Sequence, residues 1–305
     1  MALPDLSPGL KLTIPMNSQT ESILFIGHGE WSQKVSNVIF ESGSKLEPIV
    51  ISARNFLATE KQALPEGRNL EEFNFIWITT FPDLQLKILE KLQGLTSKII
   101  LEKPIALTLE DIQQLCSFIP KMKSSIYLSQ PWTFSKIWES ASTQIVRNSE
   151  NLEIDAFRGG ELERARISPS LDWSPHDLYL LASLMQAKEL GIESLELLSS
   201  RGSSEELLLD YQVGQAVRVN LRAGKSDSRR ACWRISVDNQ NRLEIDFDAK
   251  RITKKEESGE ITEEFDSDNP VMNMLENFRT HSSDVNWDLI FRLYSEAILA
   301  TVRNR

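Results

Sequence analysis

The sequence predicts an α/β domain with a doubly wound parallel sheet, followed by an α+β domain with an open, mainly antiparallel sheet. Over residues 22–120, short apolar runs alternate with amphipathic stretches of helical spacing, which is typical of parallel strands joined by crossover helices. Beyond residue 190, segments in which apolar and polar residues alternate are separated by polar turns, as in antiparallel strands. The chain has 305 residues, more than one hydrophobic core usually holds.

These observations divide the chain into an N-terminal extension (1–21), a parallel-sheet domain (22–130) and an α+β domain (131–305). An alternative for the last helices is that they pack back on the first domain. Hydrophobic residues make up 41% and charged residues 26% of the chain. These are ordinary values for a folded protein, so the composition excludes a disordered or collagen-like chain.

In the first domain, apolar runs predict strands at 23–26, 48–52, 75–79 and 99–101. Helices are expected between them, where apolar residues recur three or four positions apart. Thr108 and Asp111 have the spacing of a capping box, which places the start of a helix there.

The second domain begins with a predicted strand over 151–158 and a helix from about Pro175 to Gln186. Helical spacing returns over 270–302. Five alternating segments between these helices are expected to be strands, at 194–199, 206–211, 216–222, 231–237 and 242–247.

Charge and cysteine usage narrow the function classes. The formal net charge is −10 with no long basic run, which argues against nucleic acid or an anionic membrane as the main partner. Two cysteines, Cys116 and Cys232, cannot form a disulfide framework or a structural zinc site, so we expect no metal. No signal peptide precedes Ser22, and no apolar run approaches membrane-spanning length. We expect a cytoplasmic protein that binds a small molecule.

A glycine-rich turn follows the first predicted strand and opens a helix. Its two glycines would allow a tight turn and a close approach of backbone to a pyrophosphate at the helix N-terminus, as in a Rossmann dinucleotide-binding domain. Ser32 takes the place of the third glycine. The alternative is a tight turn with no ligand. The predicted cofactor contacts in this segment are Gly27, His28, Gly29, Glu30 and Trp31.

The tip of the second strand bears on the choice of cofactor. It reads Ser52-Ala53-Arg54, without the acidic residue that usually holds the ribose hydroxyls of NAD. A hydroxyl and a guanidinium suit a 2′-phosphate. We therefore favour NADP as the cofactor, with NAD as the other possibility. The alternative for Arg54 is a solvated loop residue that contacts no cofactor.

Two further segments carry groups suited to acid–base chemistry. Glu102-Lys103-Pro104 follows a strand, where Lys103 could polarise a substrate oxygen; such a tripeptide alone is more often a surface turn. In the second segment, Ser174 is the expected N-cap of a helix that begins at Pro175. This would place His176 in the first helical turn, where the helix dipole lowers the pKa of the imidazole and favours a neutral general base. Asp172 would lie just outside the helix and orient the substrate or the imidazole.

Together these motifs resemble the Gfo/Idh/MocA oxidoreductases, named for glucose–fructose oxidoreductase and inositol dehydrogenase. The matching order is Gly27-x-Gly29, Thr79-Thr80, Glu102-Lys103-Pro104 and Asp172-x-x-x-His176. The similarity extends over about residues 22–302. It implies a Rossmann domain, a second domain whose open sheet supports a homodimer or homotetramer, and nicotinamide-dependent chemistry at a carbinol carbon of a sugar or cyclitol.

The resemblance also implies roles for individual residues. Lys103 matches the active-site lysine, and His176 with Asp172 match the acid–base and substrate-positioning group. The residues implied to line the cofactor, besides those of the glycine-rich turn and the Ser52–Arg54 tip, are Thr79, Thr80, Glu102, Lys103 and Gln130.

Three positions depart from the family pattern. Ser32 replaces a glycine, Gln85 stands where the pattern after the third strand has histidine, and Tyr179 replaces an acid three residues after His176. They leave a second hypothesis open, a non-catalytic NAD(P)-binding sensor or regulatory scaffold. A third is a reductase of another ring-shaped substrate, such as a linear tetrapyrrole. Trp132, Trp138 and Trp173 would suit such a ligand, although tryptophans are more often simply core.

Overall fold

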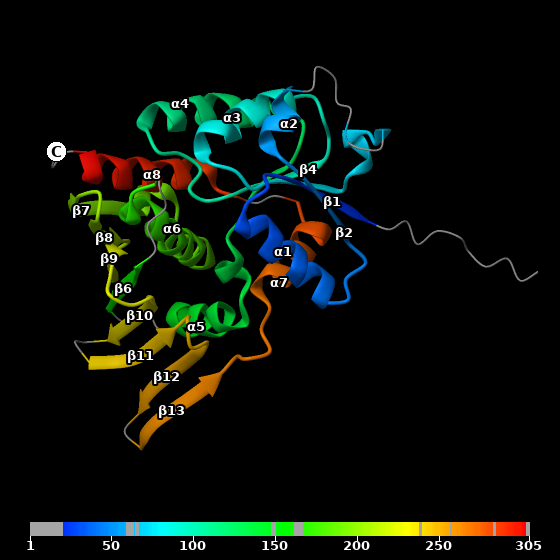
Figure 1. Ribbon diagram of the computed structural model, residues 1–305. Coiled ribbons are helices and arrows are strands. Elements are labelled where there is room, and N and C mark those ends of the chain that lie inside the picture. The colour runs from blue at the N-terminus through cyan, green and yellow to red at the C-terminus, as the bar shows by residue number, and fades with distance from the viewer. Residues whose placement is uncertain are drawn as a thin grey trace, which may run out of the picture.

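The computed structural model describes residues 21–302 except 59–63, 65–66, 148–150, 162–166, 238–239, 257 and 283–284. These residues form two sheets, a five-stranded parallel sheet and an eight-stranded, mainly antiparallel sheet. Helices cover both faces of the first sheet and one face of the second (Figure 1). The predicted fold class is confirmed.

The parallel sheet has the strand order β2-β1-β3-β4-β5. Three of its strands, β1, β3 and β5, are buried along their whole length, because helices cover both faces of the sheet, and this explains their continuous apolar sequences. The last and shortest strand, β5, was not predicted. The strands are β1 (Ser22–Ile26), β2 (Glu47–Ile51), β3 (Phe75–Ile78), β4 (Lys98–Leu101) and β5 (Ile126–Leu128).

The two faces of this sheet are covered by different sets of helices (Figure 1). One set consists of α2 (Ala53–Ala58), α3 (Pro82–Lys91) and α4 (Leu109–Phe118), and the other of α1 (Glu30–Glu41) and α7 (Pro270–Thr280). The predicted capping box at the start of α4 is confirmed: the Asp111 N–H donates to Thr108 Oγ1 at 3.1 Å, and the Thr108 N–H donates to the Asp111 carboxylate at 3.0 Å.

The second sheet has the order β13-β12-β11-β10-β6-β9-β8-β7. Its neighbouring strands run antiparallel except β6 and β9, which are parallel. The strands β12 and β13 were missed, because their sequence is mostly charged and β13 is exposed along its whole length. The strands are β6 (Leu152–Gly160), β7 (Leu195–Gly202), β8 (Glu206–Val213), β9 (Val217–Lys225), β10 (Arg230–Val237), β11 (Gln240–Asp246), β12 (Arg251–Glu256) and β13 (Gly259–Glu264).

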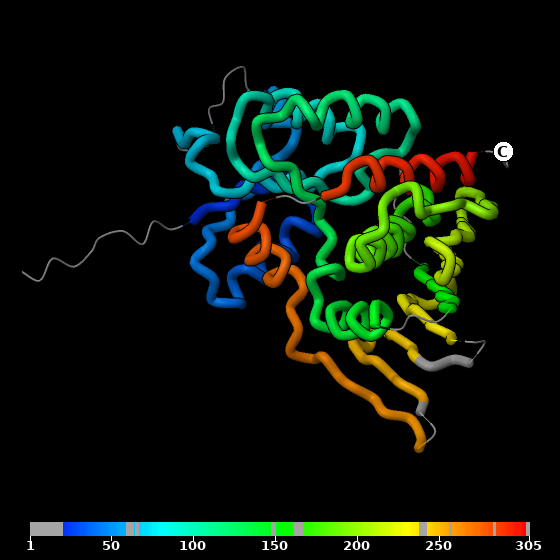
Figure 2. The backbone as a smooth tube through the Cα atoms, turned by 180° about the vertical axis from the view of Figure 1, so that it is seen from behind, coloured from blue at the N-terminus to red at the C-terminus, as the bar shows by residue number. Residues whose placement is uncertain are grey.

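One face of the second sheet packs against three helices, α5 (Lys136–Arg147), α6 (Pro169–Ala187) and α8 (Trp287–Val302). Seen from behind, α8 runs between α6 and α4 and so joins the two halves of the molecule (Figure 2). Short 3₁₀ turns complete the fold, at η2 (Leu70–Glu72), η3 (Ile119–Lys121), η4 (Pro131–Phe134) and η5 (Ile192–Ser194).

The start of α6 differs from the prediction. The helix begins at Pro169 with Ser168 as N-cap, and Pro175 lies inside it. The sequence holds two Ser-Pro pairs, 168–169 and 174–175; the second predicts a helix start, but the helix begins at the first and already contains the second. Asp172 is therefore in the first turn rather than outside the helix, and His176 is at the end of the second turn. The proposed effect of the helix N-terminus on His176 was based on a wrong position.

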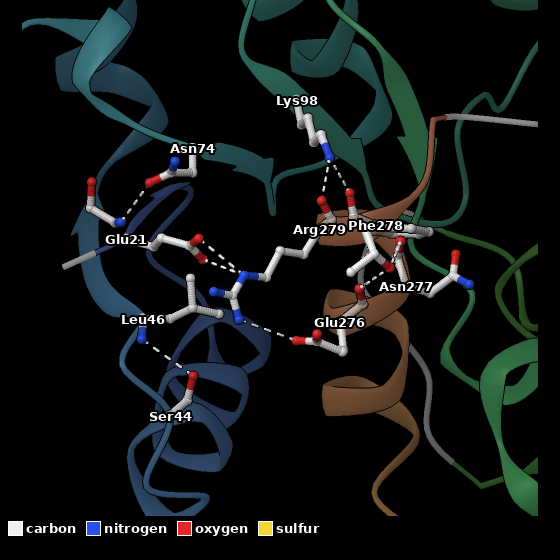
Figure 3. Close-up of polar contacts among 11 residues, drawn as sticks. Glu21, Ser44, Leu46, Asn74, Lys98, Glu276, Asn277, Phe278 and Arg279 are labelled. Carbon is white, nitrogen blue, oxygen red and sulfur yellow. Dashed lines mark hydrogen bonds and ion pairs between the residues drawn. The ribbon is translucent and has the colours of Figure 1, made fainter. Parts of the chain in front are cut away.

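The helix α7 returns from the C-terminal half to the parallel sheet. Met274, Leu275 and Phe278 pack with buried residues of β1, β3 and α1. At the end of α7, Lys98 Nζ donates to the carbonyl oxygens of Phe278 and Arg279 (Figure 3). A lysine at this position satisfies carbonyls that the helix leaves without partners and opposes the negative end of the helix dipole.

Replacing Lys98 with methionine is expected to lower the free energy of unfolding by about 1 to 2 kcal/mol, because two carbonyls at the end of α7 lose a charged donor. Urea denaturation followed by tryptophan fluorescence measures the change. Lys87→Met, at an exposed position of α3, is the matched control and should change stability by less than about 0.5 kcal/mol. Equal changes in the two variants would contradict the assigned role of Lys98.

Candidate active site

The carboxyl ends of β1, β3, β4 and β5 bring most of the predicted site residues to one edge of the parallel sheet. The Thr79 N–H donates to the carbonyl of Ile26 at 3.0 Å, and the Ser129 N–H donates to that of Leu101 at 2.8 Å. The glycine-rich turn, Thr79-Thr80, the Glu102–Pro104 segment and Gln130 thus follow strands that lie side by side. This is the edge where open α/β sheets bind ligands.

The two glycines of the turn meet different requirements. Gly27 has a φ of +142°, and a Cβ atom there would lie 2.3 Å from the carbonyl oxygen of Thr79, so the turn can pack against β3 only with glycine. Gly29 is the N-cap of α1, and a Cβ added to it would meet no atom within 4 Å. The backbone at the N-terminus of α1 therefore borders open space, as the approach of a pyrophosphate requires.

The third small residue of the motif lies in the core at the start of α1. Ser32 is fully buried, and its hydroxyl donates to the carbonyl of Gly29 at 2.8 Å. His28 and Glu30 are exposed, and Trp31 is half-buried. At the tip of β2, Ser52 Oγ accepts the Asn55 N–H at 3.1 Å.

Arg54 lies in the first turn of α2, and it is exposed. It comes two residues after Ser52 at the tip of β2. This tip lies beside the glycine-rich turn, because the Gly27 N–H donates to the carbonyl of Ile51 at 2.9 Å. This placement is compatible with contact to the 2′ side of an adenosine ribose.

Glu102 is a buried carboxylate that joins three segments. The indole N–H groups of Trp31 and Trp77 both donate to its Oε1, at 2.5 and 2.9 Å, and the Lys103 N–H donates to Oε2 at 3.2 Å. Burial raises the pKa of the carboxyl, whereas the indole donors and the charge of Lys103 lower it. Glu102 therefore ties the first turn of α1 to the strands β3 and β4.

Lys103 joins the two halves of the site. Its Nζ lies 2.9 Å from both Oδ1 and the backbone oxygen of Asp172. The exposed fractions of the two side chains are 12% and 5%. The peptide bond between Lys103 and Pro104 is cis. The ion pair holds the Lys103 ammonium group at the edge of the sheet, where it could donate to a substrate oxygen.

His176 lies four residues after Asp172 on α6, so both side chains point to nearly the same side of the helix. It is half-buried. Gln130, also half-buried, precedes η4 and follows β5 at the same edge. The structure thus brings Lys103 and Asp172 into contact and places His176 one helical turn further along.

Sequence reasoning missed a second buried ion pair behind α6. Arg158 on β6 donates to both carboxylate oxygens of Asp177 at 3.1 Å, and the Trp233 indole donates to the same carboxylate at 2.9 Å. Both charged side chains are 2% exposed. Asp177 is therefore the counter-ion of a buried guanidinium. The alternation of apolar residues along β6 places Arg158 on the buried face of the strand. No pattern in the neighbouring sequence indicates that Asp177 is its partner.

The aromatic residues near the site have separate roles. Trp138 is buried in the core against Trp233 and donates to Ser183, whereas Trp132 and Trp173 are half-buried. The hydroxyl of Tyr179 bonds to that of Tyr294 on α8 at 2.9 Å. Burial raises the pKa of both phenols, so they remain neutral hydrogen-bonding groups.

Solved structures that align with this chain include dehydrogenases of the Gfo/Idh/MocA type. UDP-N-acetylglucosamine 3-dehydrogenase GnnA from Acidithiobacillus ferrooxidans aligns with a TM-score of 0.70 at 14% identity, over 92% of this chain and 97% of that one. The chain has the Gfo/Idh/MocA fold. A candidate NADPH-dependent oxidoreductase from Desulfitobacterium hafniense aligns with a TM-score of 0.68 at 14% identity, over 94% and 96% of the two chains.

A third structure with this fold contains ligands. Scyllo-inositol dehydrogenase from Lactobacillus casei, solved with NAD(H) and scyllo-inositol, aligns with a TM-score of 0.60 at 12% identity, over 93% of this chain and 96% of that one. No protein-family model and no curated protein matches the sequence. At these identities the likeness establishes the Gfo/Idh/MocA fold, and the activity must be argued from the site.

None of the helices in the described part of the chain has the length and apolar content needed to cross a membrane. Among the same described residues, no group of three or more His, Cys, Asp or Glu side chains could hold a metal ion.

Replacing Asp177 with asparagine is expected to lower the free energy of unfolding by about 3 to 5 kcal/mol, because the buried Arg158 guanidinium loses its counter-charge. Asp210→Asn breaks a comparable two-bonded pair with Arg218, whose side chain is 52% exposed, and should cost about 1 kcal/mol or less. Chemical denaturation measures both. Similar losses in the two variants would contradict the importance assigned to the buried pair.

Proposed function

We propose that the protein is an NAD(P)-dependent oxidoreductase that transfers hydride between a nicotinamide and a hydroxyl or carbonyl carbon of a small sugar-like or cyclitol substrate. The observation that carries the proposal is the Lys103–Asp172 ion pair beside the glycine-rich turn, with His176 one helical turn away. These groups lie at the edge of the sheet where a dinucleotide binds in this fold. The dehydrogenases that share the fold support the same reaction class.

The residues around the turn fit a dinucleotide. Gly29 leaves open space at the N-terminus of α1, where backbone N–H groups can meet a pyrophosphate. We also propose that the cofactor is lined by the segment from His28 to Trp31 and by Thr79, Thr80, Glu102 and Gln130. Since Glu102 is already bound by two indoles and a backbone N–H, its contribution is to hold Trp31 and Lys103 in place.

Each group of the site has one role in the proposed mechanism. When bound, a nicotinamide ring supplies or accepts the hydride. An imidazole nitrogen of His176 takes the hydroxyl proton during oxidation and returns it during reduction. Lys103 Nζ donates to the same substrate oxygen and stabilises the negative charge that develops there. Asp172 holds the ammonium group in place through its carboxylate and its backbone oxygen.

Lys103→Ala and His176→Ala are each expected to reduce turnover by roughly a hundredfold or more, because each removes a group that acts on the reacting oxygen. Turnover is measured with NADPH and NADH against a panel of inositols, nucleotide sugars and free sugars. Lys87→Ala and His281→Ala, both at exposed positions, serve as matched controls. Wild-type turnover in both site variants would reject the assignment of these residues.

We further propose a preference for NADP, on the basis of Arg54 and Ser52 at the tip of β2. Arg54→Ala should weaken NADPH binding roughly tenfold or more, because a phosphate loses a charged donor, and should leave NADH binding nearly unchanged. Titration of tryptophan fluorescence measures both affinities, with the exposed Arg147→Ala as control. Tighter binding of NADH than of NADPH contradicts this preference. Binding of neither nucleotide rejects the cofactor and supports the non-catalytic scaffold.

The proposal includes a cytoplasmic location and a homodimer or homotetramer. Two free cysteines among the described residues are compatible with a reducing compartment. The outer face of the eight-stranded sheet would be the contact between copies. That face carries exposed ion pairs such as Arg222 with Glu206 and Arg234 with Glu244. A contact there would therefore be polar.

A further inference from the structure

One buried glutamine spans the turn that carries Lys103. Gln85 lies in the first half of α3 and is 1% exposed. Its side-chain Nε2 lies 2.9 Å from the carbonyl oxygen of Glu102 and 3.3 Å from that of Pro104. These two carbonyls stand on either side of Lys103 in the chain. A third carbonyl, that of Thr80, lies 3.3 Å from the same nitrogen.

The surroundings determine how the amide of Gln85 must be oriented. Three carbonyl oxygens face one end of it, and an amide oxygen at that end would repel all three, so the NH₂ group must be placed there. The opposite end, Oε1, is buried without a donor among the described residues, which costs free energy. Methionine would fill a similar volume without that cost. What glutamine supplies here is therefore its two N–H donors.

The donors hold the backbone from which Lys103 reaches across to α6. The turn has a second attachment, because the Lys103 N–H donates to the Glu102 carboxylate. The Glu102 carboxylate binds the backbone N–H of Lys103, whereas Gln85 binds the backbone carbonyls of the residues before and after Lys103. A displacement of about 1 Å at such a group is enough to reduce turnover strongly.

We propose that Gln85 is a positioning residue that holds the Glu102–Pro104 turn so that Lys103 Nζ reaches Asp172 and the reacting oxygen. The inference rests on the proposed function for its catalytic consequence. Its structural consequence, the 2.9 Å separation between Lys103 Nζ and Asp172 Oδ1, does not depend on any substrate.

Gln85→Met removes both donors and keeps the length of the side chain. We expect kcat to fall roughly tenfold to a hundredfold, because Lys103 Nζ is no longer held beside Asp172 and the reacting oxygen. Gln114→Met, at an exposed position of α4, is the matched control and should retain the wild-type kcat.

Gln85→Glu separates a donor role from a packing role. Burial raises the pKa of the introduced carboxyl, and only its protonated form can donate to the carbonyls. Its kcat relative to that of the wild type should therefore recover as the pH falls through this raised pKa and be lost as the pH rises. The ionisable groups of the site itself, which include Glu102, Lys103, Asp172 and His176, are present in every variant, and Gln85→Met adds no titrating group. The extra pH dependence should appear in Gln85→Glu alone.

Crystal structures of the wild type and Gln85→Met provide the readout that needs no substrate. We expect the Lys103–Asp172 contact to lengthen beyond hydrogen-bonding distance in the variant. A variant that keeps both this contact and the wild-type kcat overturns the proposal. If Gln85→Met does not fold, the pH profile of Gln85→Glu decides, and a profile parallel to that of the wild type overturns it.

The two proposals fail in distinguishable ways. Wild-type protein that binds no nucleotide and turns over no substrate rejects the proposed function, and the crystallographic comparison then decides the role of Gln85 alone. Wild-type turnover together with an unaltered Gln85→Met rejects the role of Gln85 and leaves the proposed function intact.

Discussion

Two buried ion pairs on one helix determine how the two sheets face each other. Asp172 and Asp177 are five residues apart on α6, about 140° around the helix axis. Asp172 binds Lys103 at the edge of the parallel sheet, and Asp177 binds Arg158 within the second sheet. Because a buried charge is costly without its partner, rotation or sliding of α6 would break one pair or both. His176 lies on the same helix, so its position follows from this constraint.

The first domain is connected to the same constraint through a buried carboxylate. Glu102 accepts hydrogen bonds from Trp31 in α1 and Trp77 in β3, and it immediately precedes Lys103. The segment expected to meet the pyrophosphate and the residue expected to meet the substrate are therefore held by one side chain. Glu102 is thus a carboxyl whose pKa is raised by burial and whose hydrogen bonds hold residues on both sides of the site.

The C-terminal part of the chain completes the N-terminal domain. After the strands of the second sheet, α7 covers the face of the parallel sheet beside α1, and α8 then runs between α4 and α6 (Figures 1 and 2). Lys98 at the start of β4 binds the end of α7, so residues 180 positions apart in the sequence meet. The two halves of the site are held together by this return as well as by the Lys103–Asp172 pair.

The sequence by itself determined the parallel sheet and much of the candidate site. Strands buried on both faces have continuous apolar sequences such as 75–78, and the Gly27–Gly29 and Glu102–Pro104 segments directly follow such strands. These signals are local, since each depends on neighbours along the chain.

Only the tertiary structure decided where α6 begins, which charges are paired and which charged segment forms a hairpin. Two Ser-Pro pairs give equally good local signals for a helix start, and packing of α6 against the second sheet selects the first. The strand β12 is stabilised by pairing with β11, and β13 by pairing with β12, rather than by their own apolar residues. Arg158 and Asp177, like Gln85 and the Lys103 turn, meet only after folding. Each of these features depends on contacts between residues far apart in the sequence, which no local pattern records.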